Sequence, residues 1–359
     1  MSINTGCVTI IIPNLNGEKI LKTCLDSLNR QTFRDFSVIM IDNGSSDGSV
    51  EFVRRGYANV RIIEFKENMG FSAAVNKGIK RSRSKYVCLL NNDTALAPDF
   101  LKEVITFLET REDIDYCASK MLNFSNREVL DGAGDGVIRC GVGYKIGNQE
   151  HDQRAYDDSK EVFGACAGAA IYRRSFFERI GYFDEDFFAY LEDVDINFRA
   201  KLFGLKCWYV SSARVFHVGS STTGSAFNSF IVRSTTRNML NVVVKNIPFG
   251  IFVKSFPVVL LYHLYWLFVV LNKREFFAYL EGVSTAFRDF PGMMIKRKEV
   301  LLKKVISNSE FWLSILDSEK EVMESVMRRR RETGRSTFLV ELYMKLFLRN
   351  YLKNGKIKL

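Results

Sequence analysis

The first 110 residues alternate short apolar runs with segments of helical periodicity, and this alternation restricts the possible folds more than any other feature of the chain. Apolar residues recur at helical spacing between positions 21 and 28, and residues 70–83 also read as a helix. The predicted strands flank these helices, at residues 8–12, 37–41, 60–65 and 85–90. Apolar strands that alternate with helices are typical of a mostly parallel sheet. The sequence therefore predicts a Rossmann-like α/β domain.

Polar residues follow three of these strands directly. Asn14 lies just past the first strand, Asp42 just past the second, and Asn91-Asn92-Asp93 just past the fourth. In α/β sheets of this kind, ligands bind outside the carboxyl ends of the strands, so we expect these residues to lie along one edge and form a binding site. Asp42 also has a plainer interpretation, because the turn-rich residues 43–48 after it would suit an Asx-turn and a helix cap.

The triplet Asn91-Asn92-Asp93 offers one carboxylate and two amides to a hard cation. Divalent cations that bind nucleotide diphosphates often take only one or two protein carboxylates, while phosphate oxygens and water fill the other positions. His217, one of only three histidines, closes a predicted strand at 214–217 and is a second candidate ligand. A polar strand end and a structural histidine are the alternative interpretations.

A second acidic cluster, formed by Glu192, Asp193 and Asp195, lies about 100 residues further along the chain. It stands near a predicted helix start, where negative charge is favoured by the helix dipole, so simple capping would explain it. The flanking residues are apolar, however, and such surroundings raise the pKa of a carboxylate, as a general base requires. One carboxylate site to hold a metal and another to move a proton indicate transfer chemistry on a phosphorylated donor.

Two asparagines mark the predicted helix at 70–83. Asn68 stands at its start and Asn76 lies in its body. A helix N-terminus attracts anions, so a diphosphate could bind close to Asn68. Capping and close packing of small residues would explain the same pattern without a ligand.

The composition changes beyond about residue 240. Residues 247–271 are apolar and aromatic, and their cleanest stretch, 256–271, is shorter than the roughly 20 residues that a spanning helix needs. Residues 273–359 hold 19 Lys and Arg against 11 Asp and Glu, which is +8 of the net charge of +10. An apolar segment followed by basic amphipathic helices favours an anionic membrane surface, and not nucleic acid, as the partner. A buried helical bundle with homodimer contacts and a single tilted spanning helix are the alternatives.

Cysteine usage and the N-terminus bear on the compartment. The seven cysteines are scattered, odd in number and form no C-x-x-C pair, which argues against a disulfide framework or zinc site and for a reducing compartment. No basic segment precedes the apolar run at 8–12, so we expect no signal peptide.

Taken together, these motifs resemble the inverting glycosyltransferases of family 2, which have the GT-A fold. The resemblance covers roughly residues 5–240 and is strongest for the rhamnosyltransferase branch, whose members extend lipid-linked precursors of bacterial surface polysaccharides. The segments that carry it are residues 8–17, 42–49, 68–78, 91–93, 181–195 and His217. It implies a GT-A catalytic domain over residues 1–240, followed by a membrane-associated helical region over residues 241–359.

The resemblance also implies a role for each matching residue on the donor side. Asp42 would contact the nucleobase. The residues that would line the nucleotide pocket or support the ribose and diphosphate are Pro13, Asn14, Asn16, Asn68, Gly70, Asn76 and Asn92.

The metal and the base are implied in the same way. Asn91-Asn92-Asp93 stands where the family has Asp-x-Asp, and Asp93 would bind Mg²⁺ or Mn²⁺. Because Asn91 replaces the first Asp and removes one charge, His217 becomes more relevant as a second ligand. Asp193 would be the catalytic base, and Glu192 is the competing candidate.

The implied reaction is a single displacement that moves L-rhamnose from dTDP-rhamnose onto a polyprenyl-diphosphate-linked GlcNAc acceptor, at the cytoplasmic face of the bacterial inner membrane, with peripheral or monotopic attachment. A UDP-sugar donor is the main alternative. A nucleotidyltransferase usually has a Gly-rich basic loop after the first strand, which residues 13–18 lack, and a dehydrogenase would need G-x-G-x-x-G there. A non-catalytic membrane scaffold would leave both acidic clusters unexplained.

Overall fold

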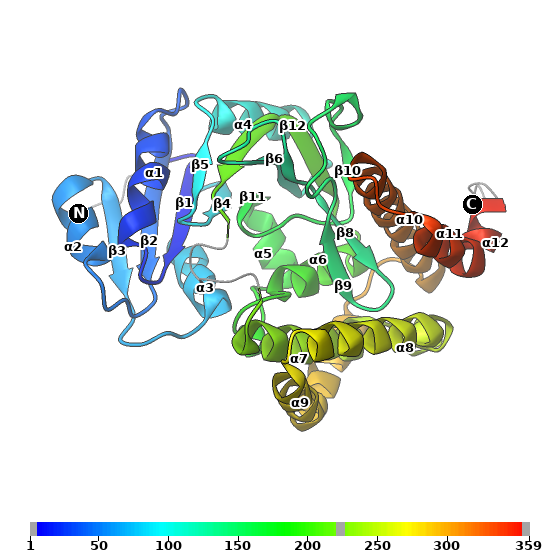
Figure 1. Ribbon diagram of the computed structural model, residues 1–359. Coiled ribbons are helices and arrows are strands. Elements are labelled where there is room, and N and C mark those ends of the chain that lie inside the picture. Colours follow the sequence, from blue (N-terminus) through cyan, green and yellow to red (C-terminus); the bar gives the residue numbers. More distant parts are fainter. Residues whose placement is uncertain (1–5, 220–226, 354–359) are drawn as a thin grey trace.

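The computed structural model describes residues 6–219 and 227–353, and a mixed β-sheet forms its centre (Figure 1). In spatial order the strands are β10 (Lys160–Val162), β12 (Cys207–His217), β6 (Tyr116–Asn123), β11 (Ala169–Arg173), β4 (Tyr86–Leu90), β1 (Val8–Asn14), β2 (Phe36–Asp42) and β3 (Val60–Glu64). Two short strands extend this sheet, β5 (Thr94–Leu96) against β12 and β7 (Leu130–Ala133) against β6.

The N-terminal half of the sheet is parallel, as the alternation of strands and helices predicts. β1 pairs in parallel with β2 and β4, and β2 pairs in parallel with β3. Consecutive strands are joined by the helices α1 (Glu18–Asn29), α2 (Ser49–Gly56) and α3 (Phe71–Arg81), and α4 (Phe100–Thr110) follows β5. The carboxyl ends of β1, β2 and β4 therefore meet at one edge, which places the polar residues that follow them together.

Both faces of the parallel half are covered. Ile10 and Ile12 of β1 belong to an apolar cluster with Leu21 of α1, whereas Ile11 belongs to a cluster with Val75 of α3. Successive side chains of a strand point to opposite faces of the sheet. A strand that is covered on both faces needs a continuous apolar run, and residues 8–12 supply it.

The second half of the sheet is mixed. β11 runs antiparallel between β4 and β6, while β12 is parallel to β6. The strand expected at 214–217 is the end of the longer strand β12, whose register is irregular between Val210 and Arg214. His217 ends β12 and pairs with Thr94 of β5. β8 (Asp135–Ile138) and β9 (Val142–Lys145) form a separate hairpin, and α5 (Arg174–Ile180) and α6 (Glu192–Leu202) lie between β11 and β12 in the chain.

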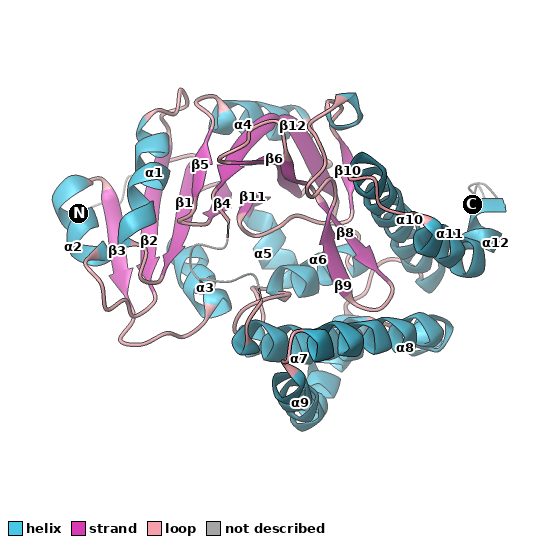
Figure 2. Cartoon of the chain, in the orientation of Figure 1, coloured by secondary structure: helices cyan, strands magenta, loops and turns pink. Residues whose placement is uncertain are grey.

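The described chain from residue 229 to residue 353 is mainly helical (Figure 2). Its long helices are α7 (Ser229–Asn246), α8 (Phe249–Asn272), α9 (Phe276–Leu302) and α10 (Asn308–Glu332), and short helical segments cover Phe338–Tyr343, Met344–Leu348 and Arg349–Lys353. α7 and α9 lie side by side (Figure 1). The domain boundary expected at residue 240 falls inside α7, which continues through that position.

α10 packs back onto the part of the chain that contains the sheet. Ser318 Oγ accepts a hydrogen bond from Val137 N in β8 at 2.7 Å. Arg139, in the β8–β9 turn, forms a buried ion pair with Glu319, with Nε 2.7 Å from Oε2. The C-terminal helices therefore share polar contacts with the hairpin beside the sheet.

The apolar segment forms a longer helix, α8, than the sequence analysis expects. The helix is continuous through Lys254 and Pro257 and has 24 residues, not the 16-residue stretch that seemed too short to span. At 1.5 Å per residue it is about 36 Å long, comparable with the hydrocarbon core of a bilayer. Within the described residues it is the one helix that is long and apolar enough to cross a membrane, by length and composition alone.

Candidate active site

A cavity of about 780 Å³ lies at the carboxyl ends of β1 and β4. Its wall also includes the start of α3, the loop before α6, β9, residues 166–168 and the first turns of α7. The predicted site residues that line it are Pro13, Asn14, Asn68, Asn92, Glu192 and Asp193. The predicted site residues that do not line it are Asn16, Asp42, Gly70, Asn76, Asp93 and His217.

A chain of hydrogen bonds joins the residues at the strand ends. Asn92 Nδ2 donates to Asn14 Oδ1 at 2.8 Å, and Asn14 Nδ2 donates to Asp42 Oδ1 at 2.9 Å. Asp42 also accepts from the backbone N–H of Ser45 at 3.0 Å, so the Asx-turn interpretation of this residue is part of its structure. The buried Asp42 carboxylate is thus fixed just behind the cavity wall, and its contact with a nucleobase stays a prediction.

Two loops beside the cavity contain a residue with positive φ, a backbone conformation that residues other than glycine rarely adopt. Asn16 has a left-handed φ of 50°, and its Oδ1 accepts from Ser46 N at 2.8 Å, which fixes the loop after β2. Gly70 has φ 87°, and a Cβ there would lie 2.6 Å from Phe188 O. Asn68 Oδ1 accepts from Gly70 N at 3.0 Å. Only glycine can bring the start of α3 this close to the loop before α6.

Asn76 lies away from the cavity. Its side chain is buried, its Nδ2 donates to Phe183 O at 2.8 Å, and its Oδ1 accepts from Phe183 N at 3.0 Å. The residue fastens the segment that leads to α6. The structure therefore does not bring it to the residues expected to hold the nucleotide.

Asp93 and His217 meet behind the cavity although more than 120 positions separate them in the sequence. His217 Nε2 lies 3.4 Å from Asp93 Oδ2, and His217 Nδ1 lies 3.0 Å from Asp131 Oδ2. Asp93 Oδ1 is buried and has no hydrogen-bond partner among the described residues. A buried carboxylate oxygen without a partner is costly, so a divalent cation would fit here. Asp131 would then orient the imidazole, as second partners of metal-bound histidines do.

The surroundings of His217 favour its protonated form. Burial lowers the pKa of the imidazole, but the hydrogen bonds to Asp131 and Asp93 outweigh this and raise the pKa to about 9. Burial would likewise raise the pKa of Asp131, but His217 and Lys145 hold it well below its usual range.

The structure brings four residues to this region that the sequence analysis did not predict, namely Asp131, Asp135, Lys145 and Cys166. Lys145 Nζ lies 2.6 Å from Asp131 Oδ2 and lines the cavity. Potential ligand atoms of Asp135, Cys166 and Asp193 lie within 4.8 Å of one another, an arrangement that could also hold a cation. Asp131, Asp135 and Lys145 come from the Gly-rich segment 130–147. Their only sequence signal was that Asp131 and Asp135 flank the small residues Gly132-Ala133-Gly134.

Asp193 stands in the first turn of α6 and lines the cavity. Burial raises the pKa of its carboxyl group, while hydrogen bonds from the backbone N–H groups of Ala167 and Val194 oppose the rise. Glu192 is more deeply buried, and burial together with the neighbouring Asp193 charge raises its pKa well above the usual value. Glu192 Oε2 has no hydrogen-bond partner in the described parts of the chain.

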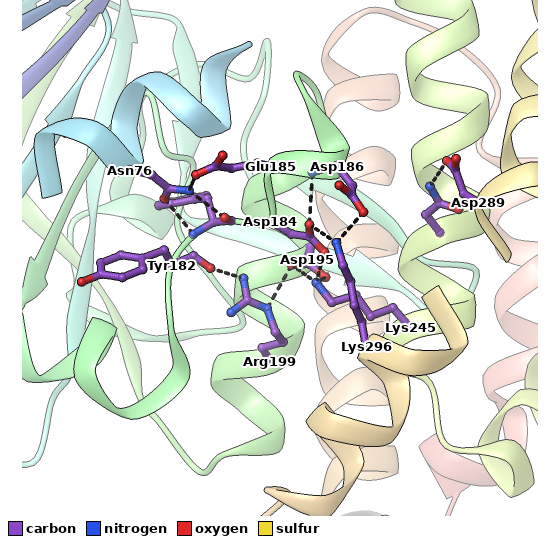
Figure 3. Close-up of polar contacts among 12 residues, drawn as sticks. Asn76, Tyr182, Asp184, Glu185, Asp186, Asp195, Arg199, Lys245, Asp289 and Lys296 are labelled. Atoms are coloured by element: carbon purple, nitrogen blue, oxygen red, sulfur yellow. Dashed lines mark hydrogen bonds and ion pairs between the residues drawn. The ribbon is translucent and has the colours of Figure 1, made fainter. Parts of the chain in front are cut away.

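Asp195 has a different role. It is fully buried, and its carboxylate lies 3.0 Å from Arg199 Nε and 2.8 Å from Lys245 Nζ of α7. Lys245 also lies 2.7 Å from Asp184, which pairs with Lys296 of α9. Figure 3 shows these side chains converging where α6, α7 and α9 meet. Asp195 therefore ties the helix that carries Asp193 to the C-terminal helices.

The sheet and the cavity define a transferase of the GT-A type. The family model "Glycosyl transferase family 2" matches residues 9–181. This matched part of the chain belongs to glycosyltransferase family 2, a family of inverting hexosyltransferases whose members bind a nucleotide-sugar donor and an acceptor.

Two curated relatives illustrate the similarity. The N-acetylglucosaminyl-diphospho-decaprenol L-rhamnosyltransferase of Mycobacterium tuberculosis (strain ATCC 25618 / H37Rv) is 28% identical over 226 residues, which cover 57% of this chain and 73% of the relative. The putative glycosyltransferase EpsH of Bacillus subtilis (strain 168) is 26% identical over 214 residues, which cover 58% of this chain and 59% of the relative.

Two solved structures share the fold. S. aureus TarS 1–349 has a TM-score of 0.51 and 17% identity, and the match covers 91% of this chain and 92% of that one. GalNAc-T7, solved with UDP, GalNAc and Mn²⁺, has a TM-score of 0.55 and 15% identity. That match covers 68% of this chain but only about half, 48%, of GalNAc-T7. These likenesses establish the GT-A architecture.

Proposed function

We propose that this protein is a metal-dependent inverting glycosyltransferase that moves L-rhamnose from dTDP-rhamnose onto a polyprenyl-diphosphate-linked GlcNAc acceptor during the assembly of a bacterial surface polysaccharide. The observation that carries the proposal is the single cavity whose wall holds both the residues at the ends of β1 and β4 and the carboxylate of Asp193. A donor held at the strand ends would thus present its sugar to a base in the same cavity.

The proposed chemistry is one displacement. Asp193 takes the proton of an acceptor hydroxyl while that oxygen forms a bond to the anomeric carbon. The bond from the anomeric carbon to the diphosphate breaks in the same step, and the electron pair leaves with the nucleoside diphosphate. A single displacement inverts the anomeric centre, by the logic of inverting glycosidases. When Asp93 and His217 hold Mg²⁺ or Mn²⁺, the ion supplies positive charge that stabilises the leaving diphosphate.

The choice of donor and acceptor rests on similarity. The relative from Mycobacterium tuberculosis is named for rhamnosyl transfer to N-acetylglucosaminyl-diphospho-decaprenol and matches 57% of this chain. A UDP-sugar donor in the same cavity is the alternative, and GalNAc-T7 was solved with UDP.

The helical region supports an acceptor that is anchored in a membrane. Large apolar side chains are exposed along three helices, namely Phe249, Phe256, Leu264 and Phe268 of α8, Phe277 and Phe287 of α9, and Phe338 and Leu339 of α11 (Phe338–Tyr343). Basic residues dominate the same part of the chain. We propose peripheral or monotopic attachment to the anionic cytoplasmic face of the inner membrane.

α8 keeps contact with the rest of the protein along its length, which supports attachment on the surface and not a crossing. Val258 and Val259 pack against Cys140 in the β8–β9 turn. Further along, Trp266 Nε1 donates to Thr236 Oγ1 of α7 at 2.8 Å. A helix that crossed the bilayer would have to give up these contacts.

Release of nucleoside diphosphate from a panel of nucleotide sugars tests the proposal. The assay contains Mn²⁺ and polyprenyl-diphosphate-linked GlcNAc. We expect acceptor-dependent release of dTDP from dTDP-rhamnose that is lost with EDTA. Release of UDP from a UDP-sugar instead would support a glycosyltransferase but contradict dTDP-rhamnose as its donor. Release without acceptor dependence would exclude this acceptor.

A further inference from the structure

The loop just before Asp193 has an unusual backbone. Phe188, Tyr190 and Leu191 lie in the left-handed region, with φ values of 60°, 69° and 62°. An L-residue with a Cβ is strained in this conformation. All three residues line the cavity, and Leu191 is the N-cap of α6, which begins at Glu192. The conformation of this loop therefore sets where the two acidic side chains stand.

The start of α3 supports one side of the loop. Phe188 O accepts a hydrogen bond from Ser72 N at 3.2 Å. Gly70 lies so close to Phe188 that no side chain would fit between them. Residues in such rare conformations persist only where their surroundings fix them, so a second support must act on the other side.

Asn238 of α7 supplies that support. Its side-chain nitrogen Nδ2 lies 2.9 Å from Phe187 O, 3.0 Å from Ala189 O and 2.7 Å from Tyr190 O. Asn238 is fully buried, and its Oδ1 has no hydrogen-bond partner within residues 6–219 and 227–353. The side chain therefore acts on the loop as a donor only. If it were removed, three carbonyl oxygens inside the protein would lose their shared N–H donor.

We infer that Asn238 is a positioning residue, which holds residues 187–191 in their strained conformation and thereby places Asp193 against the acceptor hydroxyl. The inference rests on the proposed role of Asp193 as the base. It also means that α7, a helix of the C-terminal region, completes the active site from outside the part of the chain that the family model matches.

Asn241 offers a matched control on the same helix. It is also buried, but its Nδ2 donates to Asp289 Oδ2 of α9 at 3.0 Å and not to the loop. Asn238→Ala and Asn241→Ala therefore each remove one buried amide from α7. Asn238→Asp adds a second test, because it keeps the shape of the side chain but replaces the N–H donors by an acceptor.

Hydrogen exchange of the loop tests the inference without reference to the reaction. In the full chain, we expect backbone amides of residues 187–194 to exchange at least about tenfold faster in Asn238→Ala and Asn238→Asp than in wild type. Asn241→Ala should leave them unchanged. Wild-type protection of the loop in both Asn238 variants would overturn the inference, whatever the protein catalyses.

Kinetics test the positioning role. With the nucleotide sugar that the panel identifies, we expect Asn238→Ala to lower kcat on the order of 100-fold, as a misplaced catalytic group does, with the Kd for the nucleoside diphosphate changed less than about threefold. Asn241→Ala should keep most of kcat. A faster-exchanging loop with unchanged kcat would overturn the positioning role. The protein could also turn over no sugar while its loop exchanges faster only in the Asn238 variants. That result would support the role of Asn238 in holding residues 187–191 and overturn the proposed function.

Discussion

Three carboxylates lie within four residues at the start of α6, yet their surroundings assign them different tasks. Asp195 is bound by Arg199 and Lys245 and is fully buried. Glu192 lines the cavity but is buried more deeply than Asp193, and its pKa is raised further. Asp193 combines access to the cavity with a raised pKa, which are the two properties that a general base needs.

Replacing Asp193 tests this assignment. Asp193→Asn should lower kcat by about 10² to 10⁴, the usual contribution of a general base, and should leave the Kd of the nucleoside diphosphate nearly unchanged. Calorimetry of nucleotide binding alongside the release assay would separate the two effects. Glu192→Gln is the matched variant and should retain more activity. If Glu192→Gln were the inactive variant and Asp193→Asn active, the base would be Glu192.

The metal pair predicts a dependence on pH. A cation binds the neutral imidazole only, and the pKa of His217 is raised to about 9 by Asp131 and Asp93 despite burial. Below that pH the cation must displace a proton, so the affinity for Mn²⁺ should rise by up to about tenfold per pH unit and level off near the raised pKa. Electron paramagnetic resonance of free Mn²⁺, at a fixed nucleoside diphosphate concentration, measures this.

Asp131→Asn is the control for this prediction. It removes the larger of the two hydrogen-bond effects that raise the pKa of His217, so the affinity should level off at a lower pH. Loss of the orienting carboxylate should also weaken Mn²⁺ binding by about 10- to 100-fold. An affinity that stays flat over the whole range from neutral to mildly alkaline pH would remove His217 from the ligand set.

At the scale of elements, a buried ion pair between Arg139 and Glu319 helps to join α10 to the β8–β9 hairpin. Arg139 Nε and Nη2 lie 2.7 and 2.8 Å from the two carboxylate oxygens of Glu319, and Tyr343 OH donates to Oε1 at 2.6 Å. Glu319→Gln would leave the Arg139 charge buried without a counterion. Breaking a buried pair in this way costs about 3 to 5 kcal/mol.

Chemical denaturation checks this prediction through the free energy of unfolding. Glu324→Gln on the same helix is the matched control, because Glu324 forms only an exposed pair with Lys320 at 3.7 Å. Exposed pairs contribute about 0 to 1 kcal/mol. Equal losses in the two variants would mean that the ion pair does not hold α10 in place.

The elements differ in how well the sequence predicts them. β1, β2, β4 and α3 follow from local periodicity, because each is buried on both faces or along one stripe by neighbours close in sequence. The hairpin of β8 and β9 gives no such signal. It has four residues per strand, and it is fixed by contacts with α10, such as those of Val137 N with Ser318 and of Arg139 with Glu319, which lie about 180 positions later in the chain.

The residues of the candidate site also differ in how well the sequence predicts their positions. Asn14, Asp42 and Asn92 could be placed together from the sequence, because parallel strands end at one edge. Asp131 could not, since it reaches His217 only through the pairing of β7 with β6 and of β12 with β6. Lys145, in the separate β8–β9 hairpin, joins this group by its contact with Asp131. The role of Asn238 could not be predicted either, because an asparagine inside a helix gives no indication of the loop to which it donates hydrogen bonds.

At the scale of the whole molecule, the apolar surface of the C-terminal helices and the active site belong to one unit. α7 contacts the loop before Asp193 through Asn238, and it packs beside α9, which exposes large apolar side chains. An enzyme that acts on a lipid-linked acceptor needs its cavity at a fixed height above the membrane. A binding surface built on the helices that also support the cavity would provide it.

This arrangement predicts that the exposed face of α8 determines membrane binding. Phe256 and Leu264 are 50% and 55% exposed and lie on the same face, two helical turns apart. Replacing both by serine removes two large apolar side chains, each of which contributes about 1.5 to 3 kcal/mol when fully buried. The double variant should therefore bind vesicles containing anionic lipid at least about tenfold more weakly in a flotation assay.

Met69 and Tyr182, exposed by 49% and 40% in the catalytic half, provide the matched control for serine replacement. Their double variant should bind vesicles like wild type, because they lie outside the helical region. Binding that is weakened equally in both double variants would reflect general surface apolarity and contradict a specific role for α8. Binding that is unchanged in the α8 variant, but lost when anionic lipid is omitted, would assign attachment to the basic residues alone.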